Sequence, residues 1–398
     1  MLERLTLLDF RGYAELEATF GPGPQLIWGP NAAGKTSLLE AIVLAAWGRS
    51  HRTSTDAEMI RFTRPLARVE AGIGGLLVPE RTVEVALVGS GGGGQRKRIR
   101  VNGVPRRGSG LLGVLRIVLF APEEMLLVAG SPSLRRTAVD QLAGQRSAAH
   151  LRNLATYGRA LQQRNGLLRA IREEQAARDE LRFWDATLIE AGGDIVAERL
   201  RALGDLAEPL ARAHGEIAPE EAAGRGLTVR YETNAPAFDG ETPRDALARR
   251  LVETAEKEVW NGTTLVGPHR DDLVFELDGR DLAGFGSRGQ QRTAILALKL
   301  AELDLLTELD ARPPLLLLDD VFSELDPARR AHLVRRIAEL PQAFVTTTAL
   351  EDLDPELRAA ATAWAVTSGP EGARLLGPTG PGTGAATRTE RTSERASA

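Results

Sequence analysis

Two glycines, a lysine and a threonine near the N-terminus have the spacing of a phosphate-binding loop. The segment Gly29-Pro30-Asn31-Ala32-Ala33-Gly34-Lys35-Thr36 follows the pattern G-x-x-x-x-G-K-T and is continued by Ser37. Glycines let backbone N–H groups converge on phosphate oxygens without interference from Cβ atoms. The lysine would neutralise the terminal phosphates, and the threonine hydroxyl would ligate Mg²⁺. The pattern predicts that residues 29–37 bind ATP and that Lys35 takes part in catalysis.

A pair of carboxylates follows an apolar run late in the chain. Four consecutive leucines at 315–318 lead directly into Asp319 and Asp320. Ligand sites of α/β proteins lie at the carboxyl ends of their parallel strands. We therefore expect Asp319 to coordinate Mg²⁺ together with Thr36, and Asp320 to act as a base or to orient water. The alternative is a strand that simply ends in acidic residues, and the phosphate loop disfavours it.

A third motif begins a strongly apolar helix. Residues 285–292 read Phe-Gly-Ser-Arg-Gly-Gln-Gln-Arg. Backbone N–H groups and a serine hydroxyl at a helix N-terminus can bind phosphate. Ser287 and Gln290 also have the spacing of a capping box, and this motif alone would be read as an ordinary helix cap. Beside the other two motifs, it predicts that Ser287, Gly289 and Gln290 contact a nucleotide.

Several periodic segments would position these motifs. Strands are predicted over residues 2–10 and 25–28, and a helix over 35–46, so the glycine loop lies between a strand and a helix as a phosphate loop requires. Further strands are predicted at 81–88, 96–101, 315–318 and 343–347, with a turn at Asn102-Gly103 and an apolar helix that follows the motif at 285–292 and runs through Leu306. This arrangement predicts an α/β fold.

The composition excludes several classes of protein. The chain has 398 residues, 43% apolar content, no cysteine and a net charge of −4. The absence of cysteine excludes a disulfide framework. The N-terminus lacks the pattern of a secretory signal, and no apolar run reaches the ~18 residues that span a bilayer. We expect a cytoplasmic protein that does not bind membranes, and any contact with DNA must come from local basic patches.

The middle of the chain has a different pattern. Residues 133–213 are rich in Ala, Leu, Arg, Glu and Gln, with leucines at helical spacings but no sustained heptads. We expect an ATPase lobe formed by residues 1–120 and 264–376, with a mainly helical lobe of residues 121–263 inserted in it and no long coiled coil. Residues 377–398 are rich in Gly, Thr, Ser, Arg and Glu and have no large apolar side chain, so we predict that they form a disordered tail.

The combined motifs resemble the head of an ABC-type ATPase. The phosphate loop, the serine-glycine motif and Asp319 are followed by Ser323-Glu324-Leu325-Asp326, which looks like the D-loop of such heads. The resemblance implies that two subunits sandwich ATP. Ser287, Gly289 and Gln290 of one subunit would then reach the γ-phosphate bound by the other subunit.

Further segments narrow the resemblance to the RecF family of bacterial recombination mediators, from residue 1 to about residue 376. They are Phe10-Arg11-Gly12-Tyr13, residues 121–128 (APEEMLLV), Gly130-Ser131-Pro132 with Arg135-Arg136, Gln163-Arg164-Asn165, residues 267–272 (GPHRDD) and residues 289–292 (GQQR). The resemblance implies a slow, DNA-stimulated ATPase of replication, recombination and the response to DNA damage. It also implies that Arg11 lies beside the nucleotide phosphates.

The same resemblance implies the partners. An ATP-induced homodimer would clamp duplex or gapped DNA, including single-strand/duplex junctions. With the RecO and RecR proteins, it would promote RecA loading on single strands coated by SSB. Two other classes remain open: an ABC transporter ATPase subunit, and a scaffold that binds ATP without hydrolysing it. The helical insertion disfavours the transporter class, and Asp320 disfavours the scaffold.

The sequence departs from related ATPases at three places. Ala32-Ala33 stands where the family's loop is richer in glycine, and Asp320 is one methylene shorter than a catalytic glutamate, which implies slow hydrolysis. Transporter heads carry a histidine after the last core strand, where this chain has Thr346-Thr347-Thr348. The chain contains 5 histidines, and we interpret His269 as part of a structural turn instead of a metal ligand.

Four basic clusters are candidates for DNA contact, and for each the alternative is a solvated surface. They are Arg96-Lys97-Arg98 with Arg100, Arg106-Arg107, Arg135-Arg136, and Arg49-Ser50-His51-Arg52. Few aromatic residues lie among them, which disfavours recognition of single strands by base stacking. Contact with the phosphates of duplex DNA is the favoured interpretation.

Overall fold

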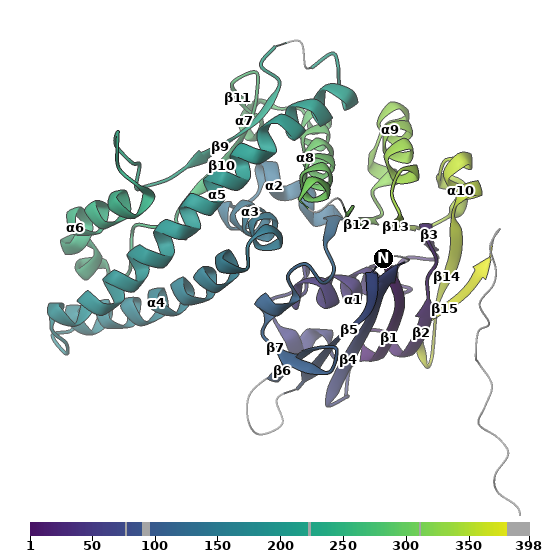
Figure 1. Ribbon diagram of the computed structural model, residues 1–398, viewed down its shortest axis with the longest axis horizontal. Coiled ribbons are helices and arrows are strands. Elements are labelled where there is room, and N and C mark those ends of the chain that lie inside the picture. The colour runs from purple at the N-terminus through teal and green to yellow at the C-terminus, as the bar shows by residue number, and fades with distance from the viewer. Residues whose placement is uncertain (76–77, 90–95, 222–223, 310–311, 380–398) are drawn as a thin grey trace, which may run out of the picture. The chain divides into compact units, whose positions relative to one another are not determined.

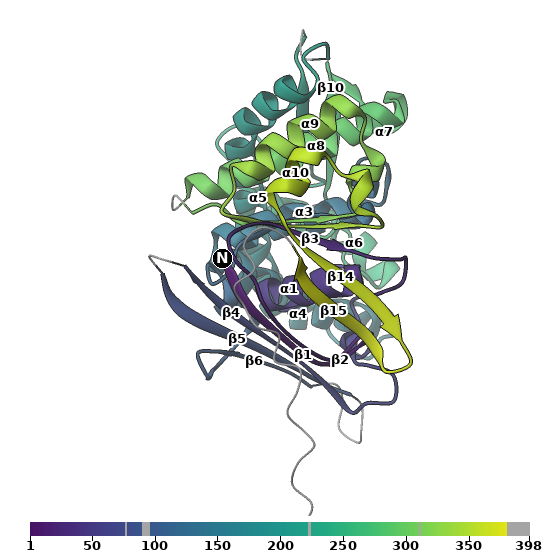
Figure 2. The same cartoon turned by 90° about the vertical axis from the view of Figure 1, so that its right-hand side faces the viewer.

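The computed structural model describes residues 1–75, 78–89, 96–221, 224–309 and 312–379. These residues form two compact units. Unit 1 combines residues up to Arg106 with those from Leu315 onward, and unit 2 runs from Arg107 to Pro314. Figures 1 and 2 show the elements of each unit. The phosphate loop and the Asp319-Asp320 pair lie in unit 1, whereas the Ser287 motif lies in unit 2.

One sheet of unit 1 is antiparallel, with strand order β2-β1-β4-β5-β6-β7. Its strands are β1 (Leu2–Phe10), β2 (Tyr13–Thr19), β4 (Leu66–Gly75), β5 (Val78–Val88), β6 (Arg96–Val101) and β7 (Val104–Arg106). Alternate residues such as Leu5, Leu7, Val69 and Val85 are fully buried. This period of two is what a sheet with one covered face requires. Asn102 and Gly103 both have positive φ, which suits the two-residue turn between β6 and β7.

The second sheet of unit 1 contains the parallel strands that lead to the site. In it, β12 (Leu315–Asp319), β13 (Gln342–Thr347), β3 (Gly23–Trp28) and β14 (Thr362–Gly369) pair in parallel, and β15 (Gly372–Thr379) pairs antiparallel with β14. Helix α1 (Lys35–Trp47) lies between the two sheets and contacts β4 of one and β13 of the other (Figure 2). Its central residues are buried around its whole circumference, which explains its uniformly apolar sequence. Helices α9 (Pro327–Ala338) and α10 (Pro355–Ala360) complete the unit.

Unit 2 is mainly helical and is organised along one long helix. Helix α5 (Leu181–Ile217) packs against α4 (Ala148–Arg172), α6 (Pro243–Asn261) and α8 (Arg288–Glu308), and Figure 1 shows α4 and α5 side by side. The remaining helices are α2 (Leu126–Ala129), α3 (Pro132–Arg146) and α7 (Leu282–Phe285). Strand β8 (Ile117–Phe120) also belongs to this unit. Because α5 packs against helices of its own unit, it is part of a folded lobe and not of a coiled-coil arm.

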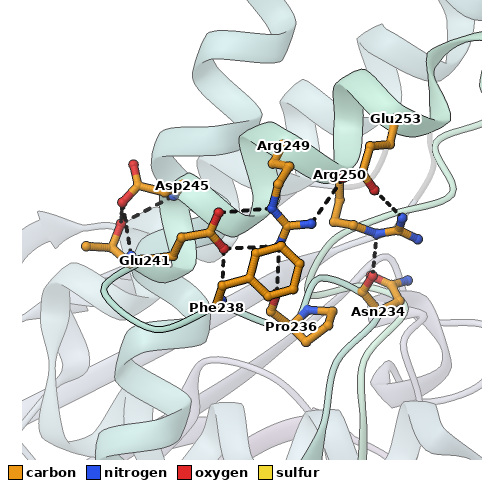
Figure 3. A network of polar contacts seen from close by, with 9 residues as sticks. Asn234, Pro236, Phe238, Glu241, Asp245, Arg249, Arg250 and Glu253 are labelled. Atoms are coloured by element: carbon orange, nitrogen blue, oxygen red, sulfur yellow. Dashed lines mark hydrogen bonds and ion pairs between the residues drawn. The ribbon is translucent and has the colours of Figure 1, made fainter.

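A small antiparallel sheet completes unit 2, with strand order β11-β10-β9. Its strands are β9 (Leu227–Glu232), β10 (Asp272–Leu277) and β11 (Arg280–Asp281). Figure 3 shows how α6 fixes the loop that follows β9. The Arg249 guanidinium lies 3.9 Å from the centre of the Phe238 ring, donates a 2.9 Å hydrogen bond to Glu241 and a 2.8 Å bond to the Pro236 carbonyl. This combination of cation–π contact and charged hydrogen bonds explains how a loop without a large apolar core keeps one conformation.

The predicted α/β class is confirmed: the two sheets and α1 form one unit, and a mainly helical lobe is inserted between the two halves of its sequence. The compact units, however, divide at 106/107 and 314/315, whereas we expected the boundaries at 120/121 and 263/264. Residues 264–314 join unit 2 because α8 packs on α5 and because β10 pairs with β9. Sequence patterns locate such elements but do not indicate which neighbour they pack against.

The end of the chain also differs from the expectation. Strand β15 reaches Thr379, three residues into the segment that we predicted to be disordered from 377 onward. The reason is that its antiparallel pairing with β14 continues to the pair Ala363–Thr379. Residues 380–398, the rest of that predicted tail, lie outside the described residues.

Candidate functional site

The phosphate loop connects β3 to α1 and is held closely against its surroundings. Gly29 has a φ of 151°, and a Cβ there would lie 2.2 Å from the Val366 carbonyl oxygen of β14. Gly34 has a φ of 120°, and its Cβ would lie 3.0 Å from Ala373 and 3.2 Å from the Tyr13 hydroxyl. Both positions therefore require glycine, for conformation and for space. Between them, residues 30–32 are exposed.

The two alanines at the centre of the loop differ in their surroundings. Ala32 has a φ of 62°, in the left-handed region that glycine adopts more readily. Ala33 is buried, and its N–H donates a 3.3 Å hydrogen bond to the Pro30 carbonyl. Ala32 thus takes a left-handed conformation, at a conformational cost of about 1–2 kcal/mol.

Lys35 covers the carbonyl groups of the loop. Its ammonium donates hydrogen bonds of 2.7 Å to the Gly29 carbonyl and 3.0 Å to the Pro30 carbonyl. Burial lowers the pKa of Lys35, while the carboxylates of Asp320 and Asp319 act in the opposite direction. A lysine with few partners other than loop carbonyls can transfer its hydrogen bonds to phosphate oxygens.

The hydroxyl of Thr36 meets the first of the two carboxylates. Thr36 Oγ1 donates a 3.2 Å hydrogen bond to Asp319 Oδ1, although the two residues are 283 positions apart. Asp319 is the last residue of β12 and is buried. A hydroxyl and a carboxylate are oxygen donors of the kind that Mg²⁺ prefers. The structure thus brings together the two residues that the sequence predicts as metal ligands.

Thr346 was not among the predicted site residues, but it links the Asp319 carboxylate to the backbone of Asp320. It lies opposite Asp319 in the β12–β13 pairing and is fully buried. Its hydroxyl donates a 2.6 Å hydrogen bond to Asp319 Oδ1 and accepts a 2.9 Å bond from the Asp320 N–H. Asp320 itself has a φ of 53°, so the chain turns sharply at the end of β12. The only signal in the sequence was the row of three threonines.

Arg11 lies in the turn between β1 and β2. Its guanidinium donates hydrogen bonds of 2.8 Å and 2.6 Å to the two carboxylate oxygens of Glu40. A third bond of 2.6 Å reaches the Glu58 carbonyl. In the same turn, the Tyr13 hydroxyl donates a 3.1 Å bond to the Gly34 carbonyl of the phosphate loop. Glu40 was another residue that the sequence did not single out, because a lone glutamate within an apolar helix has no motif around it.

The Ser287 motif forms the N-terminus of α8 in unit 2. Ser287 Oγ accepts a 3.2 Å bond from the Gln290 N–H, and Gln290 Oε1 accepts a 2.9 Å bond from the Ser287 N–H. This is the capping box that the spacing suggested. Ser287 and Gly289 are exposed at the surface of their unit. Capping therefore uses the polar atoms of the motif without burying them.

The segment from Gly267 to Asp272 forms a structural turn within unit 2. The Tyr157 hydroxyl lies 2.7 Å from His269 Nδ1, and burial lowers the pKa of His269 to about 4. Asp271 accepts a 2.6 Å hydrogen bond from the Tyr231 hydroxyl. Among the described residues, no group of three or more His, Cys, Asp or Glu side chains could hold a metal ion. His269 is half-buried and is held in this turn by its contact with Tyr157.

The four basic clusters have different surroundings. Arg135 forms a two-bond ion pair with Asp272, at 2.7 Å and 2.8 Å, and Arg136 donates a 2.7 Å bond to the Asp271 carbonyl, so both serve the interior of unit 2. Arg52 lies 3.5 Å from Glu40. Arg98 and Arg106 are exposed on β6 and β7 of unit 1. Of these clusters, Arg135-Arg136 is thus engaged within unit 2, whereas the clusters on β6 and β7 present exposed cations.

None of the helices in the described ranges is long and apolar enough to cross a membrane.

Known proteins resemble this chain along nearly its whole length. Residues 1–358 match the family "RecF/RecN/SMC N terminal domain". The "DNA replication and repair protein RecF" of Limosilactobacillus fermentum is 40% identical over 93% of this chain and 98% of its own length. The protein of the same name from Chloroflexus aurantiacus is 41% identical, over 92% of this chain and 98% of its own length.

Solved structures agree with these relatives. A structure of the "recombination mediator protein RecF-ATPrS in RecFOR pathway" has a TM-score of 0.83 and 30% identity, and covers 95% of this chain and 98% of its own. The Smc head domain from Pyrococcus yayanosii, solved with a coiled coil and joint, has a TM-score of 0.51 at 12% identity over 94% of this chain and 96% of its own, and shares the fold. The chain therefore belongs to the RecF family of DNA replication and repair proteins, among the ATPases of the RecF/RecN/SMC class.

Proposed function

We propose that this chain binds and slowly hydrolyses ATP, and that ATP controls its grip on DNA during recombinational repair and replication. The observation that carries the proposal is the 3.2 Å hydrogen bond between Thr36 and Asp319, which brings the phosphate loop to the carboxyl end of β12. A phosphate cradle and an acidic strand end at one place are the two parts that nucleotide hydrolysis needs. Relatives solved with ATP and ATPrS support the choice of nucleotide.

The residues present fit a nucleotide and a magnesium ion. Gly29 and Gly34 allow the loop to pack closely against Val366 and Tyr13, and Lys35 supplies the cation over the loop carbonyls. The ATP-binding set is the whole run Gly29, Pro30, Asn31, Ala32, Ala33, Gly34, Lys35, Thr36 and Ser37. Thr36 and Asp319 would hold Mg²⁺, which supplies charge neutralisation on the phosphate oxygens. Lys35 adds a second positive charge at the terminal phosphates.

Asp320 is the residue that we assign to the attacking water. It follows Asp319 at the end of β12, where the Thr346 hydroxyl accepts a hydrogen bond from the Asp320 N–H and fixes the turn. A carboxylate within reach of water can orient it and accept its proton. Because aspartate is shorter than glutamate, we infer slow turnover, which suits a timer of DNA release better than a motor.

We further propose that ATP closes a homodimer. Ser287, Gly289 and Gln290 would contact the nucleotide held by the other subunit, and their exposure at the N-terminus of α8 supports this role. The N–H groups of a helix N-terminus attract anions. Arg11 would lie beside the phosphates of its own subunit's nucleotide, next to the loop that Tyr13 contacts.

DNA is the proposed macromolecular partner, bound by its phosphates. Arg98 and Arg106 are exposed on neighbouring strands of unit 1, whereas Arg100 lies 3.8 Å from Glu84. Such cations favour duplex, gapped or junction DNA over stacking on single strands, because few aromatic residues accompany them. A solved relative is described as a recombination mediator of the RecFOR pathway. On that ground we propose RecO and RecR as partners, with RecA and SSB-coated strands as the substrate of the process, in the cytoplasm where the DNA lies.

Steady-state hydrolysis of ATP by the parent chain and by Lys35→Met and Asp320→Asn tests the proposal. We expect slow hydrolysis that requires Mg²⁺ and rises when duplex DNA is added. Both substitutions should reduce it by about 10²-fold or more, because each removes a charged group from the reaction centre. Lys35→Met should also lose ATP affinity, whereas Asp320→Asn should keep it. Parent and Asp320→Asn proteins with equal rates would favour a scaffold that binds ATP without turnover.

A further inference from the structure

Glu40 is a charged residue in the middle of the buried helix α1. It is the sixth residue of that helix, and its side chain is 0% exposed. The next residues in the chain are Ala41, Ile42 and Val43, all fully buried. Burying a carboxylate is costly unless it is paired and hydrogen bonded. Its presence there points to a use beyond packing, since an apolar side chain would pack in α1 without that cost.

Three side chains surround the Glu40 carboxylate. Arg11 donates to both oxygens, with 2.8 Å from Nε to Oε2 and 2.6 Å from NH2 to Oε1. Ser50 Oγ donates a 2.5 Å bond to Oε1, and Arg52 NH1 lies 3.5 Å from Oε2. Burial acts to raise the pKa of Glu40, but the hydrogen bonds from Arg11 and Ser50 hold that pKa below its ordinary value. Glu40 is therefore an anion that Arg11 pairs with through two parallel bonds.

Arg11 is held from a second direction as well. Its NH1 donates a 2.6 Å bond to the Glu58 carbonyl, and its own N–H donates a 2.8 Å bond to the Met59 carbonyl. The backbone of Arg11 is left-handed, with a φ of 49°. These three side-chain bonds use one N–H of each guanidinium nitrogen. Because NH1 and NH2 each carry two N–H groups, one on each remains for a further acceptor.

The turn that carries Arg11 also contacts the phosphate loop. Tyr13 lies two residues after Arg11 and donates its 3.1 Å bond to the Gly34 carbonyl. Glu40 and Lys35 belong to the same helix, five residues apart, so the partner of Arg11 and the cation of the loop are part of one rigid element. The guanidinium is thereby fixed relative to the loop from α1 and from the β1–β2 turn.

We propose that Glu40 is a positioning residue for ATP binding: its two-bond pair with Arg11 orients the guanidinium so that its remaining N–H groups meet the phosphates. This inference rests on the proposed function, in which Arg11 lies beside the nucleotide. A lysine at position 11 would keep the charge but could not form the paired bonds. A glutamine at position 40 would keep the volume but lose the negative charge.

The test is a double-mutant cycle on ATP affinity. The Kd for ATP with Mg²⁺ is measured for the parent chain, Glu40→Gln, Arg11→Ala and the double variant. We expect each single substitution to raise Kd by about tenfold, the low end of the effect of removing a supporting partner at metal sites. The double variant should be no weaker than Arg11→Ala alone, because Glu40 acts only through Arg11. Losses that multiply in the double variant would contradict the proposal.

Three further variants make the outcome decisive. Ser50→Ala removes one bond to Glu40 but leaves the Arg11 pair, and its Kd should stay within about twofold of the parent. A tenfold loss in Ser50→Ala would mean that loosening the buried carboxylate is sufficient, and the positioning role would be rejected. If Glu40→Gln does not fold, Arg11→Lys is measured in place of the double-mutant cycle. It should lose affinity for ATP as Arg11→Ala does. Lys35→Met tests the proposed function separately, and ATP affinity equal to that of the parent would contradict that function. If Lys35→Met loses affinity for ATP but Glu40→Gln keeps it, only the role of Glu40 is rejected.

Discussion

At the scale of single residues, the site depends on hydroxyl groups and glycines as much as on charged groups. The sequence identified Lys35, Thr36 and Asp319 because each belongs to a contiguous motif, and the structure brings them together. It did not identify Thr346 or Glu40, since each is defined by a partner far along the chain. The pairing of β12 with β13, which brings Thr346 to Asp319, is not encoded in any local spacing.

Thr346→Val tests the link between the Asp319 carboxylate and the backbone of Asp320. The substitution keeps the shape but removes the donor to Asp319 and the acceptor for the Asp320 N–H. A buried N–H without a partner costs about 1–3 kcal/mol, so we expect the free energy of unfolding to fall by that amount. ATP hydrolysis should fall by about tenfold with a higher requirement for Mg²⁺. Thr348→Val is the control, because its hydroxyl makes only a 3.5 Å contact with exposed Asp352; equal rates in both variants would refute the role.

At the scale of elements, the phosphate loop depends on what packs beside it. The sequence predicted the strand, loop and helix around it, because the change from a strand to a helical pattern is local. It could not predict that β14 pairs with β3, since residues 362–369 carry no motif that indicates which strand they pair with. The close approach of Val366 to Gly29 follows from that pairing.

Gly29→Ala should therefore disrupt more than the loop. The new Cβ would lie 2.2 Å from the Val366 carbonyl oxygen, and the φ of 151° is one that side chains rarely adopt. We expect a loss of about 1–3 kcal/mol in the free energy of unfolding and a weakened affinity for ATP. Gly21→Ala is the matched control, because a Cβ there meets nothing within 4 Å. Chemical denaturation of both variants makes the comparison, and equal stability would show that β14 gives way without cost.

Helix α8 carries a buried cluster whose charge should depend on pH. Lys299 lies 2.5 Å from Glu124 and 3.2 Å from Glu302. Burial raises the pKa of Glu302 to about 7, with Lys299 opposing and Glu124 adding to the rise. Lys299 does not cancel the effect of burial on the pKa of Glu302, because that carboxylate shares the Lys299 cation with Glu124. Folding then favours protonated Glu302, so its contribution to stability is present below its ordinary pKa of 4.5 and is lost as pH rises toward 7.

Glu302→Gln should remove this dependence. We compare the unfolding free energy of the variant with that of the parent at each pH. The variant should gain about 1–3 kcal/mol relative to the parent between pH 4.5 and pH 8. Taking the difference cancels His269, whose pKa is lowered to about 4 by burial and whose contribution is instead lost as pH falls. Denaturant unfolding at a series of pH values provides the measurement. A difference that does not change with pH would mean that Glu302 is charged throughout.

At the scale of the whole molecule, the three motifs divide between the two units. The sequence predicted an ATPase head with a helical insertion, which the family relationship confirms. It assigned residues 264–314 to the ATPase lobe, whereas the structure groups them with unit 2 because α8 packs on α5. Long helices pack where their side-chain surfaces are complementary, and this complementarity cannot be seen in a single sequence without its fold.

The proposed homodimer makes a prediction about Ser287. Ser287→Arg should abolish dimer formation with ATP and Mg²⁺ by placing a long side chain where the partner's nucleotide would lie, while each subunit still binds ATP. Thr242→Arg is the matched control, because Thr242 also begins a helix of unit 2 with a capping box. Sedimentation with and without ATP distinguishes the two variants. A Ser287→Arg chain that still dimerises with ATP would exclude a role for this motif at the interface.

If ATP controls the grip on DNA, the affinity of the chain for DNA at physiological salt must depend on ATP. Duplex, single-stranded and gapped DNA are each titrated with the parent chain and with Lys35→Met, with and without ATP and Mg²⁺. We expect tight binding to duplex-containing DNA only for the parent chain with ATP. The affinity should fall steeply as salt rises, since phosphate contacts release counterions. Equal binding with and without ATP, or equal binding by Lys35→Met, would contradict control by ATP.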